Sequence, residues 1–277
     1  MSGFEAEAAD AVRRALAEDV GSGDITTNFC IPIEARAIGR MIARQSLTLA
    51  GVELLPLIFP DCEVTLRHGS GARLDCGDEI GVVAGPARSL LTGERTALNF
   101  VQRLSGIATL TSAYVKAVEG TGCRILDTRK TTPGLRRLEK MAAAAGGAVN
   151  HRMGLYDAVL IKNNHIAAAG GVRAALERTR NAGVPVEIEV RTRAELDEAL
   201  DCGAKHLLLD NLAPDEAREW VEHIGGRARV ELSGGITLES VRAYAETGAD
   251  FVSCGAITHS ARAVDINFRL DLGAVAK

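Results

Sequence analysis

The spacing of apolar and polar positions divides the chain into two parts of different character. Residues 5–19 have the period of an amphipathic helix, whereas residues 35–86 break into short apolar runs separated by Gly, Asp and Pro, which is typical of strands and turns. A helical pattern without proline follows at about 88–119. We therefore predict a small α+β domain that a long helix joins to the rest of the chain.

Beyond residue 122, short apolar segments alternate with helical ones. The predicted strands are 123–128, 157–162, 186–190, 206–210, 229–233 and 251–255. Two of the intervening helices, 193–204 and 238–249, close with a Gly-Ala pair that leads into the next strand, and glycine just past a helix end is a common stop. Strands that alternate with helices predict a parallel sheet, closed or nearly closed into an α/β barrel.

Polar residues gather where the predicted strands end. They are Asp127, Arg129, Lys130, Lys162, Glu189, Asp210, Ser233 and Gly255. Because barrel enzymes carry their active sites at the carboxyl ends of the strands, we expect these residues to lie close together at one edge of the sheet.

The charge along the chain points to an anionic ligand at that edge. Residues 127–140 hold five cations and two acids, a local balance of +3 in a chain of net charge −4. Four permanent cations could converge on one pocket, together with His151: Arg129, Lys130, Arg152 and Lys162. Arginine binds a carboxylate or phosphate through two hydrogen bonds, and lysine acts as a compact charge. We expect His165, by contrast, to be structural.

Two glycine-containing segments indicate a phosphate site. Gly234 and Gly235 follow one predicted strand, and Gly255 follows the next, so backbone N–H groups at helix starts are exposed to a ligand. Ser233 and His259 could add side-chain donors. The alternative is that the glycines only make tight turns between strand and helix.

Two acids, Glu189 and Asp210, end neighbouring predicted strands. Among cations they suggest Mg²⁺ coordination, proton transfer or stabilisation of a developing positive charge, and the alternative is an ion pair with nearby lysines. Arg95, on the long helix, is by itself indistinguishable from a surface arginine.

Composition excludes several classes of protein. No basic face or tail is present, which argues against a binder of nucleic acid or of membrane surfaces. No apolar run is long enough for a membrane span or a signal peptide, so we expect a cytoplasmic protein. The six cysteines stand singly, which predicts reduced thiols rather than metal knuckles or redox pairs.

Eight motifs occur in order from residue 16 to residue 260: LAEDVGSGDITT, ERTALNFVQRLSGIAT, DTRKTTPGLR, NHRMGLYDAVLIKNNHI, EIEV, LLLDN, SGGI and GAITHS. In these the chain resembles the quinolinate phosphoribosyltransferases of NAD biosynthesis. The resemblance implies an N-terminal α+β open sandwich, a C-terminal irregular α/β barrel and a homodimer with shared active sites. It also implies the reaction of quinolinate with phosphoribosyl pyrophosphate (PRPP) to nicotinate mononucleotide, pyrophosphate and CO₂, with Mg²⁺ and no organic cofactor.

Residue roles follow from the same resemblance. Quinolinate would be held by Arg129, His151, Arg152 and Lys162, with Arg95 from the partner subunit. The residues that serve the ribosyl pyrophosphate and its metal would be Lys130, Glu189 and Asp210, with Mg²⁺ at the two acids. Phosphate would lie against Ser233, Gly234, Gly235, Gly255 and His259. Asn163 departs from the family pattern, in which many relatives carry an acid, and so does a turn within residues 43–51.

On this basis we divide the chain into a sandwich domain, 1–115, and a barrel domain, 116–265, with the tail 266–277 packing on the first. Four other functions stay open. The fold also serves nicotinate phosphoribosyltransferases and a paralogue associated with molybdate-transport operons. A strand-end lysine such as Lys162 could form a Schiff base in an aldolase, and the chain could be a non-catalytic sensor of sugar phosphates, although such a sensor has little use for Glu189 and Asp210.

Overall fold

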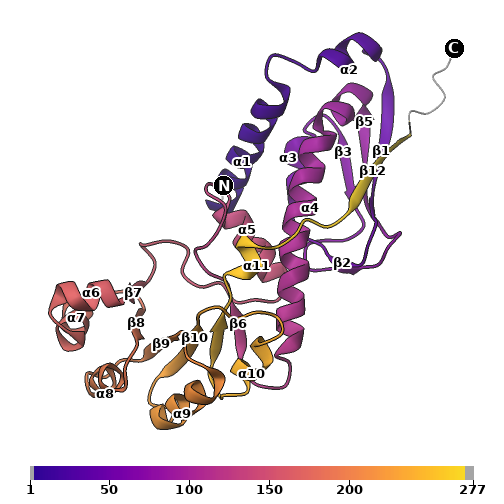
Figure 1. Cartoon of the computed structure of the whole chain (residues 1–277). Coiled ribbons are helices and arrows are strands. Elements are labelled where there is room, and N and C mark those ends of the chain that lie inside the picture. The colour runs from indigo at the N-terminus through magenta and orange to yellow at the C-terminus, as the bar shows by residue number, and fades with distance from the viewer. Residues whose placement is uncertain (1–2, 272–277) are drawn as a thin grey trace. The chain divides into compact units, whose positions relative to one another are not determined.

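The computed structural model describes residues 3–271 and consists of two compact units (Figure 1). The first, which we call the antiparallel unit, comprises residues 3–112, 131–147 and 260–271 of the described chain. The second, the parallel unit, comprises residues 113–130 and 148–259. Residues 131–147, which the sequence places in the barrel domain, thus cluster with the first unit. The end of the predicted tail, 272–277, lies outside the described residues.

An antiparallel sheet forms the centre of the first unit. Its order is β12 (Ile266–Asp271), β1 (Arg36–Ala43), β5 (Glu79–Pro86) and β3 (Glu63–Leu66). Exposed and buried residues alternate along β1, so one face of the strand covers the core, as a half-buried sheet requires. The tail strand β12 pairs with β1 along its whole length, so the end of the described chain lies beside the first strand.

The other elements of this unit are mostly helical. They are α1 (Gly3–Val20), α2 (Ile25–Cys30), η1 (Val52–Leu54), α3 (Leu55–Ile58), α5 (Arg136–Ala145) and most of α4 (Ala87–Ala117), with a short pair β2 (Leu47–Thr48) and β4 (Arg73–Leu74). The predicted long helix is confirmed as α4. Its buried positions Ala97, Val101, Leu104 and Ala108 recur every three or four residues, which is the apolar stripe of a packed helix.

The parallel unit contains all six strands that the sequence predicts. In sheet order they are β6 (Arg124–Leu126), β11 (Phe251–Ser253), β10 (Arg229–Ser233), β9 (His206–Asp210), β8 (Val186–Val190) and β7 (Val159–Ile161), and every pair is parallel (Figure 1). Within residues 3–271, β6 and β7 are the edges of this sheet, and a single bridge joins Leu126 of β6 to Val149. The α/β class is therefore confirmed, with a sheet that hydrogen bonds leave open between β6 and β7.

Helices connect the strands from β7 to β11: α6 (Asn163–Ala169), α7 (Val172–Thr179), α8 (Arg193–Asp201), α9 (Pro214–Ile224) and α10 (Val241–Ala245). One more, α11 (Ala256–His259), follows β11. The three leucines of β9 are all buried, as expected for a parallel strand covered on both faces. No helix within the described chain is long and apolar enough to cross a membrane.

Candidate active site

A cavity of about 440 Å³ lies at the carboxyl ends of the parallel strands, and residues of the parallel unit line all of it. It contains ten of the thirteen residues predicted for the site. They are Arg129, Lys130, His151, Arg152, Lys162, Glu189, Asp210, Ser233, Gly234 and Gly235. Five strands and the segment before β7 supply them, so residues far apart in the sequence meet at one edge of the sheet, as expected.

Asp127 attaches the segment before β7 to the end of β6. Its fully buried carboxylate accepts the backbone N–H of His151 at 2.8 Å and the side-chain amide of Asn150 at 2.6 Å. The backbone N–H of Asp127 in turn donates to Val149 at 3.2 Å. Asp127 is thus a structural residue that holds His151 and Arg152 beside the end of β6.

Two arginines bring positive charge to this part of the cavity. Arg152 donates from Nη1 to the carbonyl of Ala158 at 3.0 Å. Its pKa is lowered, first by burial and then by the positive charge of Arg129, which lines the same cavity. Two like charges in a partly buried place attract an anion, so this part of the cavity suits an anionic ligand.

Of the five cations at 127–140, only Arg129 and Lys130 line the cavity. The other three, Arg136, Arg137 and Lys140, belong to α5 in the antiparallel unit. The local balance of +3 therefore overstates the charge that this segment brings to the cavity, and Arg152 and Lys162 complete the set.

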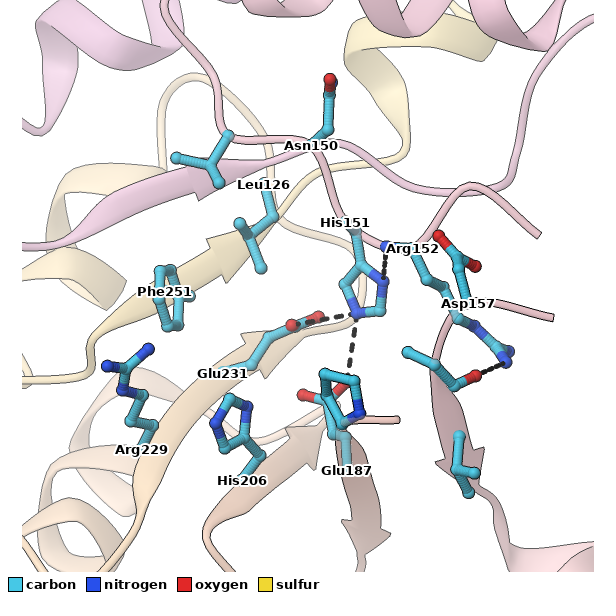
Figure 2. A pocket seen from close by; sticks show the side chains of 14 residues that line it. Leu126, Asn150, His151, Arg152, Asp157, Glu187, His206, Arg229, Glu231 and Phe251 are labelled. Carbon is cyan, nitrogen blue, oxygen red and sulfur yellow. Dashed lines mark hydrogen bonds and ion pairs between the residues drawn. The ribbon is translucent and has the colours of Figure 1, made fainter. Parts of the chain in front are cut away.

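His151 stands between two buried acids (Figure 2). Its Nε2 lies 3.1 Å from Glu187 and 3.4 Å from Glu231, and when the ring is neutral its Nδ1 accepts the backbone N–H of Arg152 at 2.7 Å. Burial opposes a charge on the ring, but the hydrogen bonds and negative charges of the two acids outweigh it and raise the pKa of His151 to about 10.

The position of the ring hydrogen decides whether this trio can bind a metal ion. The three residues are close enough for that, with ligand atoms within 4.8 Å of one another. Nδ1 accepts from the Arg152 amide when the ring is neutral, and a charged ring carries hydrogen on both nitrogens. A metal at Nε2 would leave the ring hydrogen on Nδ1, toward which the backbone N–H of Arg152 points, so the backbone disfavours that state. We interpret the trio as a hydrogen-bonded support for His151.

Glu189 and Asp210 meet at the ends of β8 and β9. The Glu189 side chain is only 4 % exposed, and Lys162 Nζ lies 3.8 Å from its carboxylate. Asp210 accepts the side-chain amide of Asn211 at 2.6 Å. Both acids are therefore close to cations and hydrogen-bond donors, and the predicted ion pair with a lysine is one of their contacts.

Arg191 is a cavity residue that the sequence reasoning missed. Its Nε and Nη2 lie 2.9 and 2.6 Å from one oxygen of Glu189, and Nη2 lies 3.9 Å from Asp210. A signal was present, since Glu187, Glu189 and Arg191 recur every second residue and so share one face of an extended chain.

The glycine turn after β10 is required by a close approach of two backbones. A Cβ on Gly234, whose φ is +108°, would lie 2.7 Å from the backbone nitrogen of Asn211. Gly235, at φ +61°, faces open space. Glycine at 234 therefore lets this turn close against the end of β9, and the adjoining residue leaves room for a ligand.

Gly255 and His259 lie beside Lys130 rather than in the lining of the cavity. A Cβ on Gly255 would lie 2.8 Å from Lys130 Cδ and 3.2 Å from the His259 ring, and Thr258 donates to the carbonyl of Lys130 at 2.8 Å.

Arg95 is exposed on α4 and belongs to the antiparallel unit, so its role stays a prediction. His165 accepts the backbone N–H of Lys162 at 2.9 Å, a structural role as expected.

The fold and the site define the class of protein. The carboxyl ends of the parallel strands carry cations, two acids and a glycine turn. This combination is typical of an α/β enzyme that acts on small substrates with several negative charges. A sequence-family model for the C-terminal domain of quinolinate phosphoribosyl transferase matches residues 107–269, and one for the N-terminal domain matches residues 24–105. The chain belongs to the quinolinate phosphoribosyltransferase family.

Individual relatives agree with the family models. The nicotinate-nucleotide pyrophosphorylase [carboxylating] of Mycobacterium leprae is 44 % identical, over 98 % of this chain and 100 % of the relative. The chloroplastic enzyme of that name from Arabidopsis thaliana is 39 % identical, over 94 % and 82 %. The solved structure of the nicotinate-nucleotide pyrophosphorylase from Francisella tularensis matches with a TM-score of 0.93 and 35 % identity over 98 % of each chain. The resemblance on the eight motifs is thus confirmed.

Proposed function

We propose that the cavity at the carboxyl ends is where this chain acts as a carboxylating nicotinate-nucleotide pyrophosphorylase of NAD biosynthesis. The reaction joins quinolinate to the ribosyl group of PRPP and yields nicotinate mononucleotide, pyrophosphate and CO₂. The observation that carries the assignment is that ten residues selected from sequence motifs line one cavity of about 440 Å³. Their charges suit the substrates, which together bring two carboxylates, a phosphate and a pyrophosphate.

Quinolinate occupies the cationic part of the cavity. Arg129 and Arg152 bind carboxylate, Lys162 adds a compact positive charge, and His151 presents its ring from the same segment as Arg152. Two carboxylates on one small ring need several fixed cations, and this part of the cavity supplies them. The arrangement therefore favours a dicarboxylate over a monocarboxylate, because the latter would leave a cation without its partner.

PRPP occupies the opposite part, formed by Lys130 and the glycine turns. Its 5-phosphate accepts from the backbone and side chains of Ser233, Gly234, Gly235, Gly255 and His259. Glu189 and Asp210 then lie near the anomeric carbon, where a carboxylate stabilises the positive charge that develops as pyrophosphate leaves.

The chemistry is governed by alignment and charge. The pyridine nitrogen attacks the anomeric carbon, a C–N bond forms, and the C–O bond to pyrophosphate breaks. Holding the two reactants in line can lower the activation barrier by several kcal/mol, within the ~7–11 kcal/mol that orientation can contribute. The quaternised ring nitrogen then accepts the electron pair of the C–C bond as CO₂ departs, and a proton replaces the carboxylate. No covalent protein nucleophile is needed.

The acids also fit a magnesium ion. Glu189 and Asp210 offer carboxylate oxygens, the ligands that Mg²⁺ prefers, and both lie within 4 Å of one guanidinium nitrogen of Arg191, so they converge on a common cation. When bound there with PRPP, Mg²⁺ would offset the charge of the pyrophosphate group. Glu189 and Asp210 are therefore the residues proposed to hold it.

We further propose a homodimer in which Arg95 reaches the partner subunit's quinolinate site. The test mixes two inactive variants, Arg95→Ala and Lys162→Ala. In a two-fold dimer each mixed species has one doubly damaged and one restored site, so free exchange restores about a quarter of all sites. If subunits demonstrably exchange and no activity returns, Arg95 acts in its own subunit.

The six unpaired cysteines agree with a reducing, cytoplasmic environment.

The direct test of the proposed function is incubation with quinolinate, PRPP and Mg²⁺, with CO₂ and nicotinate mononucleotide as readouts. We expect kcat/KM for quinolinate to exceed that for nicotinate by about 100-fold or more, because the cationic pocket is built for two carboxylates. Comparable values would favour a nicotinate phosphoribosyltransferase. An aldolase is not favoured, since Lys162 is half exposed and faces Glu189 rather than lying in the apolar pocket that activates such a lysine.

A further inference from the structure

We propose that Arg191 is a pyrophosphate-binding residue that pairs with Glu189 while the site is empty and moves to the pyrophosphate group when Mg²⁺ and PRPP bind. The inference rests on the proposed function and adds to it a residue that none of the family motifs above contains.

The first observation is the geometry of the pair. Nε and Nη2 of Arg191 both lie within 3 Å of one Glu189 oxygen, and Nη2 is also 3.9 Å from Asp210. The guanidinium group therefore stands at the two carboxylates proposed to hold Mg²⁺. One cation excludes another from the same acids, so Arg191 and Mg²⁺ compete for Glu189.

The second observation is the contrast between the backbone and the side chain of Arg191. Its backbone N–H donates to Glu195 at 2.8 Å, and Thr192 and Glu195 cap the start of α8 reciprocally, which fixes the chain here. The side chain is 48 % exposed, whereas that of Glu189 is 4 % exposed. The guanidinium can thus leave the acid without any rearrangement of the fold.

The third observation is the charge balance of the cavity. Glu189 and Asp210 are largely buried and need a positive partner in the empty site, and Arg191 is nearer to Glu189 than Lys162 is, at 2.6 against 3.8 Å. Once Mg²⁺ neutralises the acids, the released guanidinium becomes a two-pronged donor beside a pyrophosphate, the group for which that fork is best suited. Both states are then electrostatically balanced.

Isothermal titration calorimetry of three full-length variants tests this exchange. They are Arg191→Ala, Arg191→Lys and the control Arg193→Ala. Arg193 is an exposed residue of α8, and its guanidinium carbon lies 5.6 Å from the ring centroid of Trp220 on α9. MgCl₂ alone and pyrophosphate with Mg²⁺ are titrated separately, and thermal unfolding verifies the fold.

For Arg191→Ala we expect two changes of opposite sign. Mg²⁺ alone should bind about 10-fold more tightly because its competitor is gone, and Mg²⁺-pyrophosphate about 10- to 100-fold more weakly because a charge-assisted contact is lost. KM for PRPP should rise as the binding of Mg²⁺-pyrophosphate weakens, and the affinity for quinolinate should stay the same. Arg191→Lys should recover part of the pyrophosphate affinity, and Arg193→Ala should match the wild type.

Unchanged pyrophosphate affinity in Arg191→Ala would reduce Arg191 to a counter-ion and overturn the proposal. Unchanged or weaker Mg²⁺ binding in Arg191→Ala would show that Arg191 and Mg²⁺ do not compete for Glu189. A wild-type protein that binds neither pyrophosphate nor PRPP would refute the proposed function itself, and the exchange with it, so the two failures are distinguishable.

Discussion

The two ends of the parallel sheet carry cavities of similar volume and opposite character. The one at the carboxyl ends, about 440 Å³, is lined by acids and by cations such as Lys162 and Arg191, whose side chains are about half exposed. The one at the amino ends, about 330 Å³, has apolar residues such as Val159 and Phe251 in its walls, and two of its three acids, Glu187 and Glu231, lie within 3.4 Å of His151 (Figure 2). Volume therefore does not distinguish the two cavities. Half-exposed cations beside the acids Glu189 and Asp210 are found at the carboxyl ends.

His151 lines both cavities and joins their two functions. Its Nε2 is held by acids from β8 and β10, which fixes the ring, and the next residue, Arg152, lines both cavities as well. We interpret the amino end as the support and the carboxyl end as the reactive surface. Substitutions at the two ends should then affect different measurements.

The largest effect is expected at the carboxyl end, from Lys162→Ala. Loss of a charge-assisted contact to quinolinate should lower kcat/KM by about 30- to several thousand-fold, from roughly 2–5 kcal/mol. Because Lys162 is half exposed, the thermal midpoint should hardly change. The control is Lys205→Ala, an exposed lysine before β9, for which both quantities should match the wild type. Wild-type turnover of Lys162→Ala would refute the assignment of the quinolinate pocket.

At the amino end, His151→Ala should lower stability as well as activity. It leaves Glu187 and Glu231 buried without their shared partner, which should lower the free energy of unfolding by about 3 kcal/mol at neutral pH. Burial already raises the pKa of Glu187, and the variant also lacks the hydrogen bond that lowers it.

The pH dependence of that variant gives a signed check. A carboxyl with a raised pKa in the folded state favours folding while protonated, and that stability is lost as pH rises through the folded pKa. The free energy of unfolding of His151→Ala should therefore fall through Glu187 between pH 5 and pH 8, measured by urea unfolding, and this fall should be smaller in the double variant His151→Ala/Glu187→Gln. An equal fall in both proteins would show that Glu187 does not cause it.

The smallest effect comes from a matched pair of glycines in one turn. Gly234→Ala drives a Cβ into the Asn211 backbone and should disrupt the turn, with a raised KM for PRPP. Gly235→Ala meets no neighbour within 4 Å and pays only for its left-handed backbone, about 1 kcal/mol. Thermal midpoints and KM values measure both. Equal effects would mean that the close approach to Asn211 does not shape the site.

Much of this site was predictable because strand ends of a parallel sheet meet at one edge. Residues such as Lys162, Glu189 and Asp210 follow apolar runs, and that position alone brings them together. The motif resemblance supplied the roles. Strand positions and the long helix α4 were also predictable, since both depend on the local period of apolar residues.

What depends on strand register was not predictable. Glu187 and Glu231 meet at His151 only because β8, β9 and β10 align as they do, and the sequence carries no record of that alignment. For the same reason the sequence does not show that β6 and β7, the two edge strands, do not pair with each other. The assignment of residues 131–147 to the antiparallel unit depends likewise on tertiary packing, since α5 follows β6 directly in the chain.

A crystal structure of the protein with quinolinate bound tests the assignment of the two cavities most directly. The account predicts the ligand in the carboxyl-end cavity, with its two carboxylates against Arg129, Arg152 and Lys162, and no ligand at the amino ends of the strands. Quinolinate seated instead in the amino-end cavity, near Arg229 and His206, would contradict it.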